Sequence, residues 1–138
     1  MSASTGTVLY ENLNVVMNSG CYLQGGQVFD ALKAAEELAK EGIEAEVVDL
    51  RSLYPLDTEL MEQSISKTHK AIVFTEEVKR GGYGGELSAI IGEEMFDYLD
   101  APVARIGALN TPVPFAPNLE QYYMPNEKDV IAAARKMF

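Results

Sequence analysis

The sequence predicts an α/β domain in which helices cover both faces of a parallel sheet. Short apolar runs rich in β-branched residues and bounded by turn residues are typical of buried strands. These runs alternate with segments whose apolar residues recur at helical spacing, which favours right-handed crossovers and a three-layer α/β/α architecture. The length of 138 residues and the 47% apolar content suit one core, so we expect residues 1–138 to form a single domain.

Four apolar runs are the predicted strands of this sheet. They span residues 13–17, 45–50, 71–75 and 102–106. Residues 7–10 precede the first run and are joined to it through Glu11 and Asn12, so they are compatible with a further edge strand in a hairpin.

Two helices are predicted between the first three of these strands. In the first helix the apolar residues recur at i, i+4, i+7 and i+11, namely Val28, Leu32, Ala35 and Ala39. Gly42 follows them as a left-handed cap. We expect Asp57 to cap the second helix, whose inward residues are Leu60, Met61 and Ile65.

Two further helices are predicted, one after residues 71–75 and one at the end of the chain. The apolar stripe of the former comprises Leu87, Ile91, Met95 and Tyr98. Glu86, Glu93 and Asp97 lie together on another face. The last helix is expected to start at Asn126, with Asp129 in a capping-box position, and to carry Val130, Ala134 and Met137.

The charge balance excludes several classes of function. Eleven Lys and Arg against twenty-one Asp and Glu leave a net charge of −10, which opposes binding to nucleic acids or anionic membranes and favours either a basic protein partner or simply solubility. No apolar run approaches the roughly 20 residues of a membrane span. The first 20 residues lack the basic start of a signal peptide and Cys21 has no second cysteine to pair with, so we expect a cytoplasmic protein.

A glycine-rich segment, residues 79–86, is the first candidate for a binding site. It follows a predicted strand and opens a predicted helix, where backbone amides can hold an anion beside two cations. The residues of this candidate anion site are Lys79, Arg80, Gly82 and Gly84. The segment matches neither the Walker nor the dinucleotide pattern, so a tight turn that packs the helix against the sheet is favoured over a small anion- or nucleotide-binding regulatory module.

The residues that could act as nucleophile or base do not form a recognisable active site. His69 is the single histidine and stands at the end of a predicted helix, so a solvated or C-capping role is favoured. Cys21 has no base near it in the sequence. Five carboxylates between Glu86 and Asp100 form either a solvated face or a docking surface for a basic partner. We therefore expect no catalytic residue and no metal site in this chain.

Six stretches between residues 30 and 138 together carry a family resemblance: residues 31–38, 49–57, 82–86, 96–103, 112–120 and 124–125. In this order and spacing they resemble the C-terminal domain of the beta subunit of thiamine-diphosphate-dependent 2-oxo acid dehydrogenases. This decarboxylating component serves pyruvate, branched-chain 2-oxo acid and acetoin dehydrogenase complexes, and the wider fold family is the transketolase C-terminal domain. Two regions depart from the family pattern: residues 18–28, which are longer than the usual turn, and Asn110-Thr111.

The resemblance implies a mixed five-stranded sheet in the order 1-3-2-4-5, with strand 1 antiparallel, and this supports residues 7–10 as strand 1. It also implies that a thiamine pyrimidine-binding domain, with the catalytic residues, precedes the C-terminal domain in the subunit. That thiamine pyrimidine-binding domain is expected to be absent from this chain. Thiamine diphosphate and magnesium would then belong to the intact enzyme, with no cofactor bound by this chain alone.

The resemblance further implies a non-catalytic role in assembly and docking. The expected partners are the thiamine-binding domain, the alpha subunit, a second beta subunit, and the basic peripheral subunit-binding domain of the acyltransferase core. The Asp of the Leu-Asp-Ala-Pro motif and the terminal carboxylate contact that basic domain in the family, which places the partner-docking site at Asp100 and Phe138, with Asp97 nearby. A turn role for Asp100 ahead of Ala101-Pro102 is the alternative. An exposed apolar patch at Phe115, Tyr122, Tyr123 and Met124 would favour self-association.

Overall fold

The computed structural model describes residues 13–17 and 26–138. Strands and helices alternate along most of this length, as the sequence predicts. The strands are β1 (Leu13–Met17), β2 (Ala45–Asp49), β3 (Ala71–Val78) and β4 (Ala104–Ala108). The helices are α1 (Gly26–Lys40), α2 (Thr58–Thr68), α3 (Tyr83–Glu94), the 3₁₀ turn η1 (Phe96–Tyr98), α4 (Pro117–Tyr123) and α5 (Glu127–Arg135).

The four described strands form a parallel sheet in the order β2-β1-β3-β4. Val15 at its centre pairs with Val47 on one side and with Ile72 on the other. If residues 7–10 are strand 1 of the family, β1 to β4 are its strands 2 to 5. The observed order then matches the part 3-2-4-5 of the order that the resemblance implies. The antiparallel strand 1, at residues 7–10, lies outside the described residues, so the five-stranded sheet stays a prediction.

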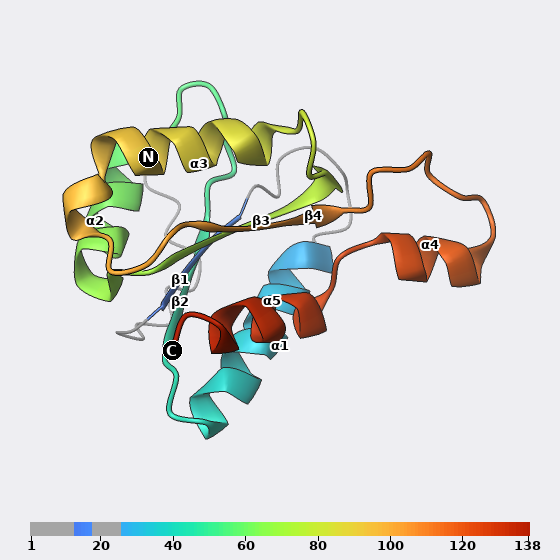
Figure 1. Cartoon of the computed structure of the whole chain (residues 1–138), viewed down its shortest axis with the longest axis horizontal. Helices are drawn as coiled ribbons and strands as arrows, with labels where there is room; N and C mark the ends of the chain where they lie inside the picture. The colour runs from blue at the N-terminus through green and yellow to red at the C-terminus, as the bar shows by residue number, and fades with distance from the viewer. Residues whose placement is uncertain (1–12, 18–25) are drawn as a thin grey trace.

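Helices cover both faces of the sheet and complete the three layers (Figure 1). The core on one face joins α1 and α5 to the strands, and the core on the other joins α2 and α3 to them. Because a parallel sheet is buried on both faces, its central strand reads as a continuous apolar run, and residues 71–75 of β3 are all buried.

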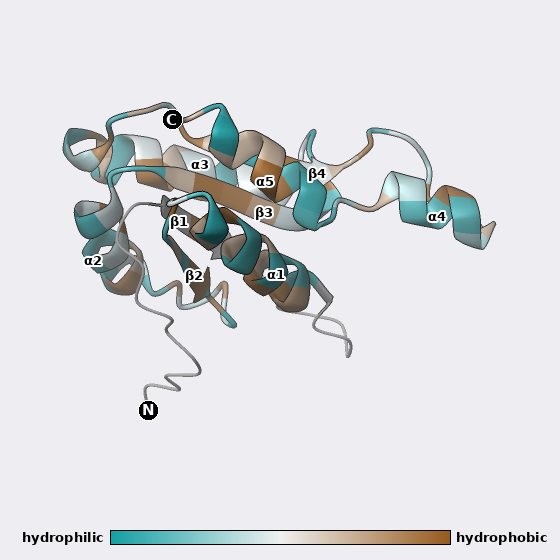
Figure 2. Ribbon diagram, turned by 90° about the horizontal axis from the view of Figure 1, so that it is seen from below, coloured by the Kyte–Doolittle hydropathy of each residue, from teal (hydrophilic) through white to brown (hydrophobic). Residues whose placement is uncertain are grey.

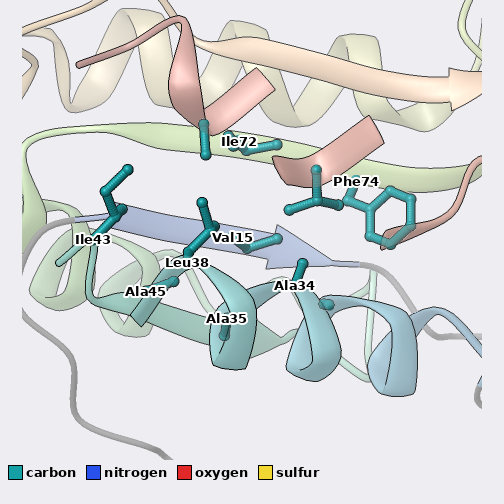
Figure 3. Close-up of a cluster of buried hydrophobic side chains, with 11 residues drawn as sticks. Val15, Ala34, Ala35, Leu38, Ile43, Ala45, Ile72 and Phe74 are labelled. Atoms are coloured by element: carbon teal, nitrogen blue, oxygen red, sulfur yellow. The ribbon is translucent and has the colours of Figure 1, made fainter. Parts of the chain in front are cut away.

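The first core combines small residues of α1 with apolar residues of the strands and of α5, and the small residues let α1 lie close to the sheet. Figure 3 shows Ala34, Ala35 and Leu38 facing Val15 and Phe74. Full burial of a side chain such as Phe74 contributes roughly 1.5–3 kcal/mol. The face of α1 that packs on the sheet is rotated from the predicted stripe, because Val28, Leu32 and Ala39 are only half-buried.

The second core confirms most of the predicted inward residues and corrects two. Met61, Ile65, Leu87, Ile91 and Met95 are buried. Leu60 is 40% exposed, because it lies one position away from the inward face that Met61 occupies. Tyr98 does not continue the stripe of α3, because that helix ends at Glu94 and Met95 has left the helical backbone region, with φ at −121°.

Three strands differ from the prediction in their bounds: β2 ends one residue early, β3 ends three residues late, and β4 is shifted by two residues at both ends. β3 runs past Thr75 to Val78, because a bulge lets its polar end keep pairing with β4. β4 begins at Ala104 rather than at residue 102, and the ladder to β3 starts with the Ala104–Ile72 pair. Pro102 has no backbone N–H to donate, which accounts for the late start.

The helix ends follow the local sequence signals. Asp57 accepts a hydrogen bond from the Leu60 amide at 2.9 Å and caps α2. Asn126 and Asp129 form the predicted capping box of α5. Gly42, with φ at +81°, takes the left-handed conformation expected after α1.

Residues 109–122, here called the arm, project from the body of the domain together with α4 (Figures 1 and 2). A hydrogen bond from the Leu109 amide to the Tyr123 carbonyl joins the two ends of the arm at its base. Phe115 and Tyr122 are exposed as predicted, whereas Tyr123 is buried at the base of the arm. α4, which begins with Pro117 in its first turn, is a helix that the periodicity of the sequence did not predict.

Candidate docking surface

The candidate docking residues meet where the α2–β3 link lies beside the η1–β4 link. We call this place the docking corner and define it by His69, Lys70, Asp97, Asp100 and Phe138. The Asp100 amide donates a hydrogen bond to the His69 carbonyl at 2.8 Å, which joins the two links. The position of Asp100 is thus set by the end of α2, which lies 31 residues earlier in the chain.

His69 acts as the C-cap that the sequence predicts. Its backbone is left-handed, with φ at +58°, and its amide donates to the Ile65 carbonyl at 2.8 Å. The ring Nδ1 lies 2.8 Å from the Tyr98 carbonyl oxygen. Since a carbonyl can only accept, Nδ1 carries the hydrogen, and the ring holds η1 against the end of α2.

Lys70 extends from the same link toward Phe138. Its Nζ lies 4.5 Å from the centroid of the Phe138 ring, within the range of a cation–π contact. The ring remains 59% exposed. Asp100 and Phe138, which the resemblance pairs, are therefore both in contact with the two-residue link His69-Lys70.

Asp97 lies on η1 and is exposed. It does not share a helix face with Glu86 and Glu93, which corrects the sequence prediction, because α3 ends before η1 begins. Its neighbour Tyr98 donates its hydroxyl to Glu62 Oε1 at 3.1 Å. This hydrogen bond raises the pKa of Tyr98, with smaller contributions from the Glu62 charge, burial and the Asp97 charge.

The corner presents negative charge to solvent. Asp97 and Asp100 are exposed, and neither carboxylate forms an ion pair with any residue in the described part of the chain. Unpaired surface carboxylates can attract a cationic partner and set its orientation. Lys70, whose ammonium lies over the Phe138 ring, is the cation of the corner.

The glycine-rich segment has the geometry of a tight turn. Gly81 has a positive φ of +74°, and a Cβ on Gly84 would lie 3.1 Å from the Thr75 side chain. The absence of side chains thus lets α3 approach β3 closely, as the favoured interpretation predicts. Lys79 and Arg80 are exposed beside this turn.

The amino end of α3 already faces an anion from the protein itself. Glu77 Oε1 accepts a hydrogen bond from the Gly84 amide at 3.0 Å. A carboxylate at this position satisfies the amide and the positive end of the helix dipole, which are the features an external anion would use. The geometry therefore weighs against the anion-binding interpretation of Lys79, Arg80, Gly82 and Gly84.

The described residues offer no group that would hold a metal ion. Within residues 13–17 and 26–138, no three His, Cys, Asp or Glu side chains come together as a candidate metal site. Cys21 lies outside this range. No helix in the described ranges is long and apolar enough to cross a membrane.

The parallel sheet and its two helical layers define a domain of the transketolase C-terminal type. A family model described as "Transketolase, C-terminal domain" matches residues 24–130, and the chain belongs to this family. The chain is 43% identical over 110 residues to the mitochondrial pyruvate dehydrogenase E1 component subunit beta of Dictyostelium discoideum. It is 46% identical over 108 residues to the 2-oxoisovalerate dehydrogenase subunit beta of Bacillus subtilis.

These alignments cover most of this chain but a minor part of each relative. The matches take in 80% and 78% of the chain, and 31% and 33% of the two relatives. Among solved structures, a split-gene transketolase described as an inactive beta4 tetramer superimposes with a TM-score of 0.73 at 28% identity. That superposition covers 94% of this chain and 40% of the other.

Sequence reasoning missed one residue of the corner, Lys70. No local signal marks it, because its contact with Phe138 joins positions 68 residues apart. The proximity exists only once α5 has packed beside α1 and brought the end of the chain to the start of β3.

Proposed function

We propose that this chain is the non-catalytic assembly and docking domain of the beta subunit of a thiamine-diphosphate-dependent 2-oxo acid dehydrogenase. In the intact enzyme, a 2-oxo acid would be oxidatively decarboxylated and its acyl group passed to lipoyl. Thiamine diphosphate and magnesium would bind to segments other than this domain. The relatives named as beta subunits of pyruvate and 2-oxoisovalerate dehydrogenases support this proposal.

The docking corner is the single observation that carries the proposal. Asp100 and Phe138 both contact the His69-Lys70 link, and Asp97 lies exposed on the neighbouring η1 of an acidic chain. We propose that this surface binds the basic peripheral subunit-binding domain of the acyltransferase core. Opposite charges would accelerate the encounter, and a few close pairs would fix the register.

The remaining partners follow from the same proposal. The thiamine-binding domain, the alpha subunit and a second beta subunit would contact other faces of this domain. The arm, with exposed Phe115 and Tyr122, is a surface suited to such contacts. Residues 7–10 would complete the sheet as an antiparallel edge strand, and the expected location remains cytoplasmic.

The docking proposal is tested by calorimetric titration of the chain with a purified basic subunit-binding domain. We expect Asp100→Asn to weaken binding by about tenfold, since it removes one partner of a close charge pair. Glu36→Gln, which removes an exposed carboxylate on α1, is the matched control and should leave binding unchanged. Equal affinity in both variants would refute the role of Asp100.

The non-catalytic assignment has a separate test. Titration of the same chain with thiamine diphosphate and magnesium should give no heat of binding. Saturable binding of the cofactor would place part of the active site on this domain and overturn the assignment.

A further inference from the structure

The edge of the sheet at β4 carries a groove that the proposed function does not use. Among the described residues β4 pairs only with β3, and its first four residues are half-buried. The additional strand predicted at residues 7–10, strand 1 of the family order, is expected beside β2 at the opposite edge of the sheet. The backbone of β4 therefore has hydrogen-bonding groups without a neighbouring strand in the described part of the chain.

The groove is lined by β4 itself, by α5 and by the link that precedes α5. We call it the β4 groove; it lies between β4, the second half of α5 and the link from α4 to α5. Its volume is about 570 Å³, and its apolar lining includes Ile106, Ala133 and Met137. Volumes of roughly 300–1,000 Å³ are typical of ligand sites. A strand of five residues spans roughly 16 Å, so the groove suits an extended segment of that length.

The charge of the groove is opposite to that of the whole chain. Lys79, Arg105 and Lys136 line it, although the chain has a net charge of −10. The Arg105 guanidinium donates to the Lys79 carbonyl and lies beside Gly85 of α3, so Lys79 and Lys136 are the cations that face an occupant. None of these three forms an ion pair within residues 13–17 and 26–138. Asp129 also lines the groove, but its carboxylate accepts the Asn126 amide at 2.9 Å in the capping box of α5.

These observations select the occupant. We propose that the β4 groove binds an extended peptide with acidic side chains, which adds to the sheet as a strand beside β4. The strand would supply the missing main-chain hydrogen bonds, and its carboxylates would meet Lys79 and Lys136. A second copy of the chain at this edge is disfavoured, because it would bring the same cations against each other.

The probe is a fluorescein-labelled peptide of eight alternating valine and glutamate residues, titrated with the full chain at low salt. We expect saturable binding with amide chemical-shift changes in Ala104–Ala108 and none in β2. The double variant Lys79→Glu, Lys136→Glu should weaken binding by about tenfold or more. The double variant Lys33→Glu, Lys40→Glu makes the same charge change on exposed positions of α1 and should bind as the native chain does.

Backbone methylation separates strand addition from simple charge attraction. Two versions of the peptide are N-methylated at alternate residues, one on each edge. A strand beside β4 uses only one of its edges, so one version should bind and the other should not. Binding of both versions, of neither version, or no binding of the parent peptide overturns the proposal. Asp100→Asn should not affect this probe, so failure here is distinguishable from failure of the docking function.

Discussion

Lys70 Nζ lies 4.5 Å from the centroid of the Phe138 ring, so a cation of the protein itself occupies the proposed docking corner. A cation over an aromatic ring contributes about 0.5–1 kcal/mol at an exposed site. An incoming basic partner would have to displace this contact or tolerate the repulsion of a like charge. The corner is thus biased against weakly basic partners.

The first prediction concerns Lys70→Met. This change should tighten binding of the basic subunit-binding domain by about two- to fivefold, since the competing cation is removed. Calorimetric titration measures the effect. Lys33→Met alters the net charge equally on exposed α1 and should have little influence. Weaker binding by the Lys70 variant would show that Lys70 supports docking rather than opposing it.

The second prediction compares two glycines of α3. A Cβ on Gly84 would lie 3.1 Å from Thr75 Cγ2 and 3.2 Å from its Oγ1, so Gly84→Ala should destabilise the domain by about 1–3 kcal/mol. A Cβ on Gly92 meets nothing within 4 Å, so Gly92→Ala should stabilise it by up to about 1 kcal/mol. Urea unfolding measures both, and similar effects at the two positions would contradict the close packing of α3 on β3.

The third prediction follows from the pair between Glu41 and Arg135. Arg135 Nε donates to Glu41 Oε2 at 3.0 Å, and this hydrogen bonding lowers the pKa of Glu41 below its ordinary value of 4.5. A carboxyl whose pKa is lowered by folding stabilises the native state above its unfolded pKa, and that contribution is lost as the pH falls through the folded pKa.

The stability advantage of the native chain over Glu41→Gln should therefore be full near neutral pH and decline as the pH falls below 4.5. The advantage is expected to be small, because the pair is exposed. Urea midpoints at a series of pH values measure it. An advantage that grew on acidification would contradict the assigned sign.

The fourth prediction concerns the glycine-rich turn. Because the Glu77 carboxylate occupies the Gly84 amide, inorganic phosphate should leave the amide shifts of residues 82–86 unchanged in the native chain. Glu77→Ala exposes that amide beside Lys79 and Arg80, so phosphate should then perturb these shifts. Phosphate-induced shifts in the native chain would revive the anion-binding interpretation.

The fifth prediction concerns the arm. Phe115 is fully exposed, and Leu119 and Tyr122 on α4 are exposed as well. We expect the chain to self-associate at high concentration through this apolar surface. Phe115→Ser should reduce that association in sedimentation experiments, while changing the free energy of unfolding by no more than about 0.5 kcal/mol. Undiminished association would place the contact elsewhere.

Local signals predicted the elements that depend on neighbouring residues. Asp57, Asn126 and Gly42 end or begin helices through bonds within one turn, so their roles are visible in the sequence. The alternation of strands and helices likewise predicted the three layers. The prediction that Leu60 and Tyr98 face inward was wrong, because apolar character alone does not indicate which side of a helix faces the sheet or where the helix ends.

By itself, the sequence determined the α/β class, the acidic charge and the family resemblance, since each depends on composition or on motifs read along the chain. Tertiary structure alone decided that His69 and Lys70 contact Asp100 and Phe138, and that Glu77 occupies the amino end of α3. It also decided that basic residues line the edge at β4, which has no second neighbour among the described strands. Contacts between distant segments depend on how helices pack over the sheet, and no spacing along the chain encodes that geometry.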